Sequence, residues 1–251
     1  MKEMGEPTFD QAAALLRGAT RVAVLTGAGV SAESGVPTFR GGGGLWEGYP
    51  VEQVATPEAF LDDPERVWRF YEQRRRNLLA VKPNPAHCVL ARWQDQFPHY
   101  TLITQNVDGL HQAAGARDVL ELHGNIWRVR CSGCGRERLE RAVPLPEAPP
   151  RCALCGALER PGVVWFGEVL PQDVLAQAWE AAERAQVLVV VGTSAVVYPA
   201  AGLIEVTARH GGTVVEVNPE PSALAFIAAI VLRGPAGTVL PRLAVRIEGP
   251  R

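Results

Sequence analysis

The chain has 251 residues, of which 47% are hydrophobic and 21% charged, and its formal net charge is −2. These values are typical of a globular protein with a sizeable core, and they indicate no overall basic surface of the kind that binds DNA or RNA. No apolar run approaches the roughly 20 residues that a membrane span requires, and the N-terminus lacks the apolar core of a secretory signal. We therefore expect a cytoplasmic monomer that binds neither nucleic acid nor membranes.

Short runs rich in valine and isoleucine alternate with longer helical patterns along the chain. Phe9–Arg17 is predicted to form the first helix. The predicted strands are Val22–Leu25, Tyr100–Thr104, Val119–Leu122, Val187–Val191, Val214–Val217 and Ala229–Leu232. Strands that alternate with helices in this way predict an α/β fold with a mostly parallel sheet.

A glycine-rich turn follows the first predicted strand. Gly27, Gly29 and Ala32 match the pattern G-x-G-x-x-A. Glycines here let the backbone turn sharply and approach a pyrophosphate, whose charge the N–H groups at the start of the next helix would meet. Ordinary strand–helix turns also contain glycines, so this motif alone leaves a dinucleotide site and a structural turn equally open.

The acid that usually follows such a turn is missing. A dinucleotide fold carries it about 20 residues later, where it holds the adenosine ribose, but that distance ends near Glu47 in a predicted loop. Other hydrogen-bonding groups follow two later strands, namely Gly192, Thr193 and Ser194 after one and Asn218 and Glu220 after the other. Open α/β sheets bind ligands at the carboxyl ends of their strands, although capping and turn formation would explain each group separately.

Two segments interrupt the alternation of strands and helices. The first starts with glycines at 41–44 and continues into Pro57–Leu79, where the spacing of large apolar residues predicts helices. The second contains four cysteines and the run PLPEAPP, which a central strand or helix would not tolerate. We predict that these insertions, approximately 39–79 and 126–165, form a smaller domain. Residues 1–38, 80–125 and 166–251 would form the large one.

Four of the five cysteines form two C-x-x-C pairs. Cys131 and Cys134 are separated from Cys152 and Cys155 by 17 residues, a spacing typical of a zinc ribbon. Four thiolates fill the tetrahedral coordination of Zn²⁺ and leave no position for substrate, so the sequence predicts one structural zinc ion in preference to disulfide bonds. The fifth cysteine, Cys88, lies in an apolar segment and is predicted to be buried.

Arginines concentrate on one predicted helix. Tyr71 could share a face with Arg74 or Arg75, whereas Arg76 would point elsewhere, because residues three and four positions apart lie together on a helix. Arginine runs on helices usually face water. From the residues alone, a solvated basic face is therefore the simpler interpretation.

The motifs GAGVSAESGVPTFRG, TQNVDGLH, LELHGN, PGVVWFGE, GTS and VNPE occur in this order, together with the paired cysteines. Jointly they resemble the sirtuin family across nearly the whole chain. The resemblance implies a Rossmann-like domain, with helices on both faces of its sheet, joined to a smaller domain made of a helical insertion and a zinc module. It also implies an NAD-dependent protein deacylase that transfers the acyl group of a lysine side chain to ADP-ribose and releases nicotinamide.

The resemblance assigns three sets of residues to NAD, which would lie between the two domains as a co-substrate. The pyrophosphate and nicotinamide ribose would contact Gly27, Ala28, Gly29, Ala32, Thr38, Phe39, Arg40 and Trp46. The nicotinamide pocket would be formed by Gln105, Asn106, Val107 and Asp108. The adenosine half would contact Gly192, Thr193, Ser194, Asn218, Pro219, Glu220 and Ala236. Asn218 and Glu220 would then replace the missing acid.

By the same resemblance His123, within LHGN, is the catalytic base. The implied reaction begins when the acyl-lysine oxygen attacks the anomeric carbon of the nicotinamide ribose, which displaces nicotinamide and forms an alkylimidate. His123, an imidazole that titrates near neutrality, would help a ribose hydroxyl attack this imidate, and water would release lysine and O-acyl-ADP-ribose. Asn106 and Asp108 would orient the ribose, the water and nicotinamide. The other histidines, His87, His99, His111 and His210, are expected to be structural.

The acyl-lysine peptide is expected to add as a strand along Val164, Trp165, Phe166, Gly167 and Glu168. The class III branch of the family, which removes acidic acyl groups, carries Tyr-x-x-Arg and a small pocket residue, matched here by Tyr71, Arg74 and Ala59. A guanidinium and a phenol can bind a carboxylate, so we predict desuccinylation and demalonylation in preference to deacetylation. The alternatives are mono-ADP-ribosyl transfer to a protein and a non-catalytic module that binds NAD and zinc.

Overall fold

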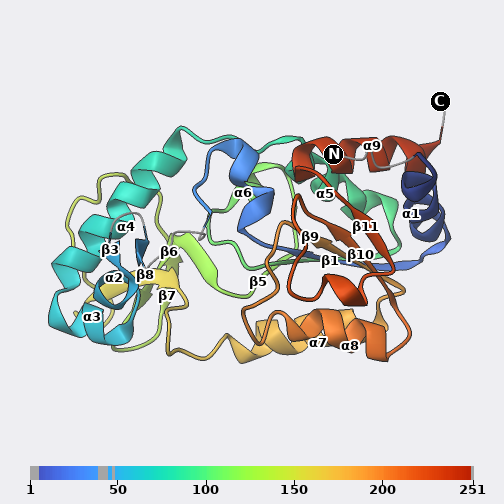
Figure 1. Cartoon of the computed structure of the whole chain (residues 1–251). Helices are drawn as coiled ribbons and strands as arrows, with labels where there is room; N and C mark the ends of the chain where they lie inside the picture. The colour runs from blue at the N-terminus through green and yellow to red at the C-terminus, as the bar shows by residue number, and fades with distance from the viewer. Residues whose placement is uncertain (1–5, 39–44, 47–48, 250–251) are drawn as a thin grey trace.

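The computed structural model describes residues 6–38, 45–46 and 49–249 (Figure 1). The α-helices are α1 (Glu6–Gly18), α2 (Val51–Val54), α3 (Pro57–Asp62), α4 (Pro64–Leu79), α5 (Pro85–Gln96), α6 (Leu110–Ala113), α7 (Gln172–Arg184), α8 (Gly202–Arg209) and α9 (Ala236–Glu248). The strands are β1 (Arg21–Thr26), β2 (Leu45–Trp46), β3 (Tyr49–Pro50), β4 (His99–Thr104), β5 (Val119–Glu121), β6 (Gly124–Cys131), β7 (Glu137–Leu139), β8 (Glu159–Val163), β9 (Val187–Val191), β10 (Thr213–Val217) and β11 (Ile230–Leu232). None of these helices is both long and apolar enough to cross a membrane.

The largest sheet contains six parallel strands in the order β11-β10-β9-β1-β4-β5. Alternate residues of β1 face opposite sides, as the pleat of a strand requires. Val22 and Val24 belong to a core covered by α1, α5 and α9, whereas Ala23 and Leu25 belong to a core covered by α7 and α8 (Figure 1). The six predicted strands and the Rossmann-like α/β architecture are confirmed.

A third core lies outside this sheet and joins the two interrupting segments. Val67 and Trp68 of α4 pack in one cluster with Ile126 and Val129 of β6, and α2 and α3 also contribute to it. Strands β7, β6 and β8 form a three-stranded antiparallel sheet on this side of the molecule. The helices predicted within Pro57–Leu79 are confirmed, and the run PLPEAPP contains no helix or strand. The domain boundaries stay a prediction.

The arginine run of α4 is not a solvated basic face. A solvated basic face requires all three arginines to be exposed. Arg74 and Arg75 are buried, and of the three only Arg76 is exposed. The Arg75 side chain donates through Nε to the carbonyl oxygen of Ile126 at 3.0 Å, and its guanidinium carbon lies 5.9 Å and 5.5 Å from the ring centroids of Trp68 and Trp127. Its burial lowers the pKa of this guanidinium, although neighbouring acids oppose the change. Arg75 therefore ties α4 to β6.

Cys88 is exposed, so the prediction that it is buried is wrong. It lies in α5, whose inner face buries His87, Val89 and Leu90. An apolar local sequence could not reveal that residue 88 falls on the outer side of the helix.

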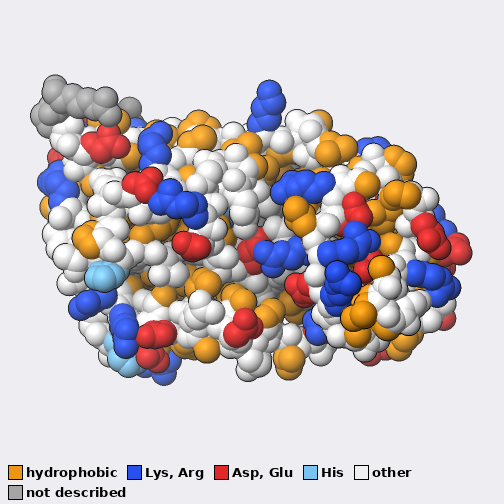
Figure 2. Space-filling view, turned by 180° about the vertical axis from the view of Figure 1, so that it is seen from behind, with side chains coloured by type: hydrophobic (Ala, Val, Ile, Leu, Met, Phe, Trp, Pro, Cys, Tyr) orange, Lys and Arg blue, Asp and Glu red, His pale blue; other side chains and the backbone are white. Residues whose placement is uncertain are grey.

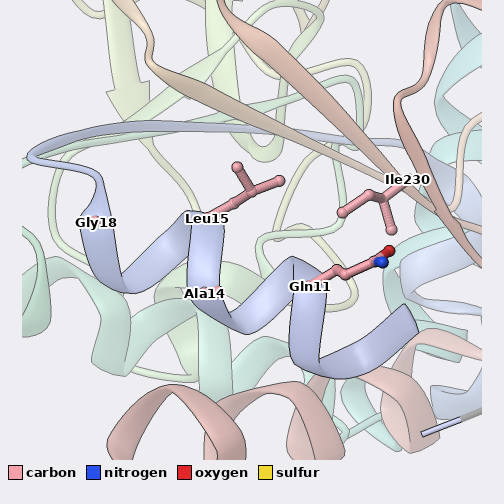
Figure 3. A pocket seen from close by; sticks show the side chains of 5 residues that line it. All are labelled: Gln11, Ala14, Leu15, Gly18 and Ile230. Carbon is pink, nitrogen blue, oxygen red and sulfur yellow. The ribbon is translucent and has the colours of Figure 1, made fainter. Parts of the chain in front are cut away.

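The surface carries both signs of charge. Basic and acidic side chains are interspersed with apolar ones on the face shown in Figure 2. A shallow depression of about 650 Å³ lies between α1 and the first residue of β11, where Gln11, Leu15 and Ile230 extend towards the same space (Figure 3). This depression is at the amino end of β11, and the predicted site residues follow the opposite ends of the strands.

Candidate active site

The predicted site residues follow the carboxyl ends of neighbouring strands. Residues 27–32 follow β1, 105–108 follow β4, 192–194 follow β9 and 218–220 follow β10, while His123 follows β5. In a parallel sheet these ends meet at one edge, which is where open α/β folds bind ligands.

The glycines after β1 allow two loops of the protein to touch. Gly27 N–H donates to the carbonyl oxygen of Val191 at 3.0 Å, and Gly29 N–H donates to that of Gly192 at 2.7 Å. A methyl group at Gly29 would lie 2.7 Å from the Gly192 oxygen, and Gly192 itself has a φ of +60°. The close approach that these glycines permit in this structure is therefore between the β1 and β9 loops.

The usual dinucleotide motif has the start of an α-helix directly after this turn, but residues 27–38 contain no α-helix. Two short 3₁₀ helices stand there instead, Ala28–Val30 and Ala32–Ser34. The N–H groups of Val30 and Ser31 are used inside these turns, because they donate to the carbonyl oxygens of Gly27 and Ala28. Thr38 is half-buried at the end of this stretch. Phe39, Arg40 and Glu47 lie outside the described residues, as does the side chain of Trp46.

Ser31 lies at the centre of the site, although the sequence did not indicate a role for it. It is fully buried, and its hydroxyl donates to Oδ2 of Asp108 at 2.8 Å. It accepts a hydrogen bond from Nδ2 of Asn106 at 3.1 Å, and its oxygen lies 3.3 Å from Nε2 of His87. The only signal in the sequence was its position inside GAGVSAESG, next to residues that were selected.

The loop after β4 is fixed from several sides. Oδ1 of Asp108 accepts from the N–H of Leu110, which starts α6, and the Asp108 carbonyl oxygen accepts from the indole of Trp127 at 2.9 Å. Nε2 of Gln105 donates to Thr193 at 3.0 Å and so connects this loop to the one after β9. Val107 is half-buried, and its carbonyl oxygen accepts from the N–H of Ile126.

The hydrogen bond of His123 defines which of its nitrogens can act as a base. Nδ1 lies 2.8 Å from the carbonyl oxygen of Gln105, and because a carbonyl can only accept, Nδ1 carries a proton. In the neutral ring the lone pair is then on Nε2. Burial lowers the pKa of His123 below its ordinary value, although the bond to Gln105 opposes this change. The half-buried imidazole is therefore neutral near pH 7 and can accept a proton at Nε2.

The buried His111 has a different environment. Its Nε2 lies 2.9 Å from the hydroxyl of Thr26, which donates to Thr104, while its Nδ1 has no hydrogen-bond partner among the described residues. Burial, with a contribution from the nearby His87, lowers the pKa of His111 to about 3. It is therefore a neutral residue beneath the β4 loop. His99 is exposed, and Nδ1 of His210 bonds the carbonyl oxygen of Val206.

The residues predicted for adenosine differ in exposure. Asn218 is buried and donates through Nδ2 to the carbonyl oxygen of Thr193 at 2.9 Å, whereas Ser194, Pro219 and Glu220 are exposed. Ala236 is buried at the start of α9. The acid buried at this strand end is Glu216, which binds Arg233 at 2.6 Å and accepts from Ser222.

The four paired cysteines form one cluster. The sulfur atoms of Cys131, Cys134, Cys152 and Cys155 all lie within 4.8 Å of one another, and no disulfide joins them. A hydrogen bond from the N–H of Cys134, among others, lowers the pKa of Cys131 to about 6, which favours the thiolate that binds metal. Four soft sulfur ligands at this spacing fit a closed tetrahedral zinc site.

The residues expected to choose the acyl group lie in the third core. Tyr71 is fully buried, and Arg74 follows one helical turn later with its guanidinium carbon 6.0 Å from the Tyr71 ring centroid. Ala59 is buried in the same cluster, as is Trp165 of the segment expected to bind peptide.

Most main-chain N–H groups of the segment 164–168 already donate hydrogen bonds within the protein. The N–H of Val164 donates to His123 and the N–H of Phe166 donates to Ala55, while those of Trp165 and Glu168 bond within the segment. A peptide strand added here would therefore pair mainly with carbonyl oxygens and with the N–H of Gly167.

Comparison with known proteins gives a consistent result. A model of the Sir2 family matches residues 27–199. An NAD-dependent protein deacylase of Aquifex aeolicus is 53% identical over 222 residues, which cover 88% of this chain and 93% of that protein. The crystal structure of a Sir2 homologue in complex with NAD has 45% identity and a TM-score of 0.89, with 95% of this chain and 93% of that chain covered. A Sir2 protein bound to a myristoylated histone peptide has 33% identity and a TM-score of 0.77, with 97% and 98% covered. The chain therefore belongs to the Sir2 family, the sirtuins.

Proposed function

We propose that this protein is an NAD-dependent protein-lysine deacylase that releases nicotinamide and O-acyl-ADP-ribose. One observation carries the proposal. His123 presents an unprotonated Nε2 at the same sheet edge where Ser31, Asn106 and Asp108 form a buried hydrogen-bonded group. The deacylase from Aquifex aeolicus, which covers most of this chain, supports the same reaction class.

NAD would supply the electrophilic ribose carbon and accept the acyl group. The loops that carry Gly27–Ser31, Gln105–Asp108 and Gly192–Ser194 would bind it, since they meet at one edge and are linked to each other by hydrogen bonds. Asn106 and Asp108 would orient the ribose, the reactive water and nicotinamide. Nε2 of His123 would then accept a proton from a ribose hydroxyl.

The cysteine cluster would bind one structural zinc ion. All four ligands would come from the protein, so the ion would stabilise residues 131–155 and would not contact the substrate. The third core would depend on it, because Cys131 ends β6, which supplies Ile126 and Val129 to that core.

We further propose that the acyl group carries a terminal carboxylate, as in succinyl- or malonyl-lysine, with acetyl-lysine a poorer substrate. Arg74 and Tyr71 support this proposal because a buried guanidinium beside a buried phenol favours an anionic partner. Burial raises the pKa of Tyr71 to about 12, although Arg74 opposes this, so the phenol keeps its proton at working pH.

The test uses NAD with peptides of one sequence that carry acetyl-, succinyl- or malonyl-lysine, and mass spectrometry of the products. We expect O-succinyl- and O-malonyl-ADP-ribose to form faster than the acetyl product. Arg74→Met should reverse this order, while Arg76→Met, an exposed neighbour on α4, should not. Desuccinylation that survives Arg74→Met would contradict the acyl preference. ADP-ribose attached to a protein acceptor, without deacylation, would instead indicate mono-ADP-ribosyl transfer, and no nicotinamide release would indicate a non-catalytic module.

A further inference from the structure

Among the residues that the structure describes, the hydroxyl of Tyr71 accepts one hydrogen bond, although a phenol can also donate one. Nε1 of Trp165 lies 2.9 Å from the Tyr71 oxygen, and an indole N–H can only donate. The tyrosine oxygen is therefore an acceptor in this bond, and its own proton is left to donate elsewhere. Among the described residues, no group accepts that proton, even though Tyr71 has no exposed surface. A buried donor without a partner is costly, which indicates that a ligand accepts it.

The indole that holds Tyr71 is itself fixed. Trp165 is almost completely buried, and the guanidinium carbon of Arg160 lies 3.4 Å from its ring centroid. Arg160 also forms an ion pair with Glu168, whose Oε2 accepts from the main-chain N–H of Trp165 at 2.8 Å. The ring of Phe60 also packs against the indole, with centroids 5.6 Å apart, so both the ring and the main chain of Trp165 are held in place.

The main chain around Trp165 connects this arrangement to the catalytic edge. On one side, the N–H of Val164 donates to the carbonyl oxygen of His123 at 2.8 Å. On the other, the N–H of Phe166 donates to the carbonyl oxygen of Ala55 at 3.0 Å, and Ala55 directly follows α2. The main chain around Trp165 is therefore bonded to the segment that carries the base and to the end of α2, while its indole contacts Tyr71 of α4.

We propose that Trp165 is a specificity-determining positioning residue, whose indole N–H orients the Tyr71 hydroxyl so that it donates to the terminal carboxylate of the acyl group. This inference rests on the proposed function and deepens it. Because the Tyr71 oxygen already accepts from Trp165, the hydroxyl can donate to the ligand. A ligand group that needs an acceptor would find none at this oxygen. The guanidinium carbon of Arg74, one turn along α4, lies 6.0 Å from the Tyr71 ring centroid and places a positive charge beside this hydroxyl. An acetyl group, which has no acceptor at its end, would gain nothing from this arrangement.

The experiment measures KM and kcat at saturating NAD for succinyl- and acetyl-lysine peptides of one sequence. Trp165→Phe keeps a ring against Arg160 and removes the donor. We expect its KM for the succinyl peptide to rise about tenfold with kcat nearly unchanged, while KM for the acetyl peptide changes by less than about twofold. Tyr71→Phe should show the same pattern, and the double variant should be no worse than Tyr71→Phe alone, because both changes remove one shared interaction.

Equal losses on both peptides, or effects that multiply in the double variant, would overturn the proposal. If Trp165→Phe fails to fold, benzothienylalanine at position 165 keeps the shape of the indole without its N–H, and the same KM difference is expected. A wild-type protein that deacetylates but forms no O-succinyl-ADP-ribose would overturn the acidic-acyl preference itself. Normal desuccinylation that is insensitive to Trp165 would overturn this inference alone.

Discussion

Ser31 and Asp108 lie on loops after different strands, and the Ser31 hydroxyl donates to Oδ2 of Asp108 over 2.8 Å. Since Oδ1 of Asp108 accepts from Leu110, each carboxylate oxygen has a fixed partner. We expect Ser31→Ala to loosen the β4 loop and to raise KM for NAD by about fivefold or more, because it removes the hydrogen bonds of this hydroxyl to Asp108 and Asn106. Initial rates at varied NAD would measure it. Ser34→Ala is the control, because Ser34 bonds Asn84 and does not contact this loop. An unchanged KM for Ser31→Ala would contradict the role.

The rate of deacylation should increase with pH and then become constant. His123 acts as a base only when neutral, and burial lowers its pKa below the ordinary value of about 6.5. Activity should therefore have reached its maximum at pH 7, and it should decrease as the pH falls through the lowered pKa of His123. A pH profile of product formation would show this. A rise that continues well above pH 7 would argue against His123 as the titrating base.

Replacing His123 should stop the reaction at a defined point. We expect His123→Asn to reduce deacylation by about 100-fold or more, which is typical for loss of a general base. Exchange of labelled nicotinamide into NAD should persist, because nicotinamide leaves before this base acts. His99→Asn, at an exposed position on β4, should leave both activities unchanged. Simultaneous loss of exchange and deacylation would mean that His123 also acts in the first step.

Because the β1 and β9 loops are in contact, we expect replacement of Gly192 to destabilise the protein more than replacement of a glycine outside these loops. Gly192→Ala should destabilise the protein by about 2 kcal/mol or more, since φ is +60° and the new methyl group would lie 2.4 Å from the Val30 nitrogen. Gly18→Ala, with no atom within 4 Å of the added methyl group, should be close to neutral. Urea denaturation of both variants would compare their free energies of unfolding. Equal values would show that the loops separate easily.

Metal analysis would test the cysteine cluster. We expect one zinc ion per wild-type chain and none in Cys152→Ser, which should also unfold at lower temperature because the third core loses its support. Cys88→Ser should keep its zinc, because Cys88 is exposed in α5 and does not belong to the cluster. Zinc retained by Cys152→Ser would show that three cysteines suffice.

Much of the fold could be predicted because it depends on local patterns. Each central strand is an apolar run buried on both faces, and C-x-x-C spacing reflects tetrahedral geometry. The surroundings of single residues could not be predicted in this way. Arg75 is buried because Ile126 supplies a carbonyl oxygen, and Ser31 matters because Asp108 lies beside it. These partners are distant in the sequence, and no local pattern links them.

Prediction of the site from the sequence had a similar limit. Residues after parallel strands meet at one edge by topology alone, so their grouping could be expected, while their individual roles stay predictions. Two 3₁₀ turns follow Gly27, and the N–H of Gly29 is bonded to Gly192, a residue of the neighbouring loop that is distant in the sequence. The burial of Cys88 could not be predicted for a simpler reason. Which side of a helix is buried depends on how the helix is rotated against the elements that pack on it.

The position of β1 between β4 and β9 constrains how the chain can fold during synthesis. β1 leaves the ribosome early, but its partner in the pairs Val22–Val187 and Thr26–Val191 follows only after the whole cysteine-containing segment has been made. Until then one edge of this strongly apolar strand has no strand to pair with. A nascent chain that stops before β9 should therefore depend on chaperones, and the cysteine segment can acquire its metal before the main sheet is complete.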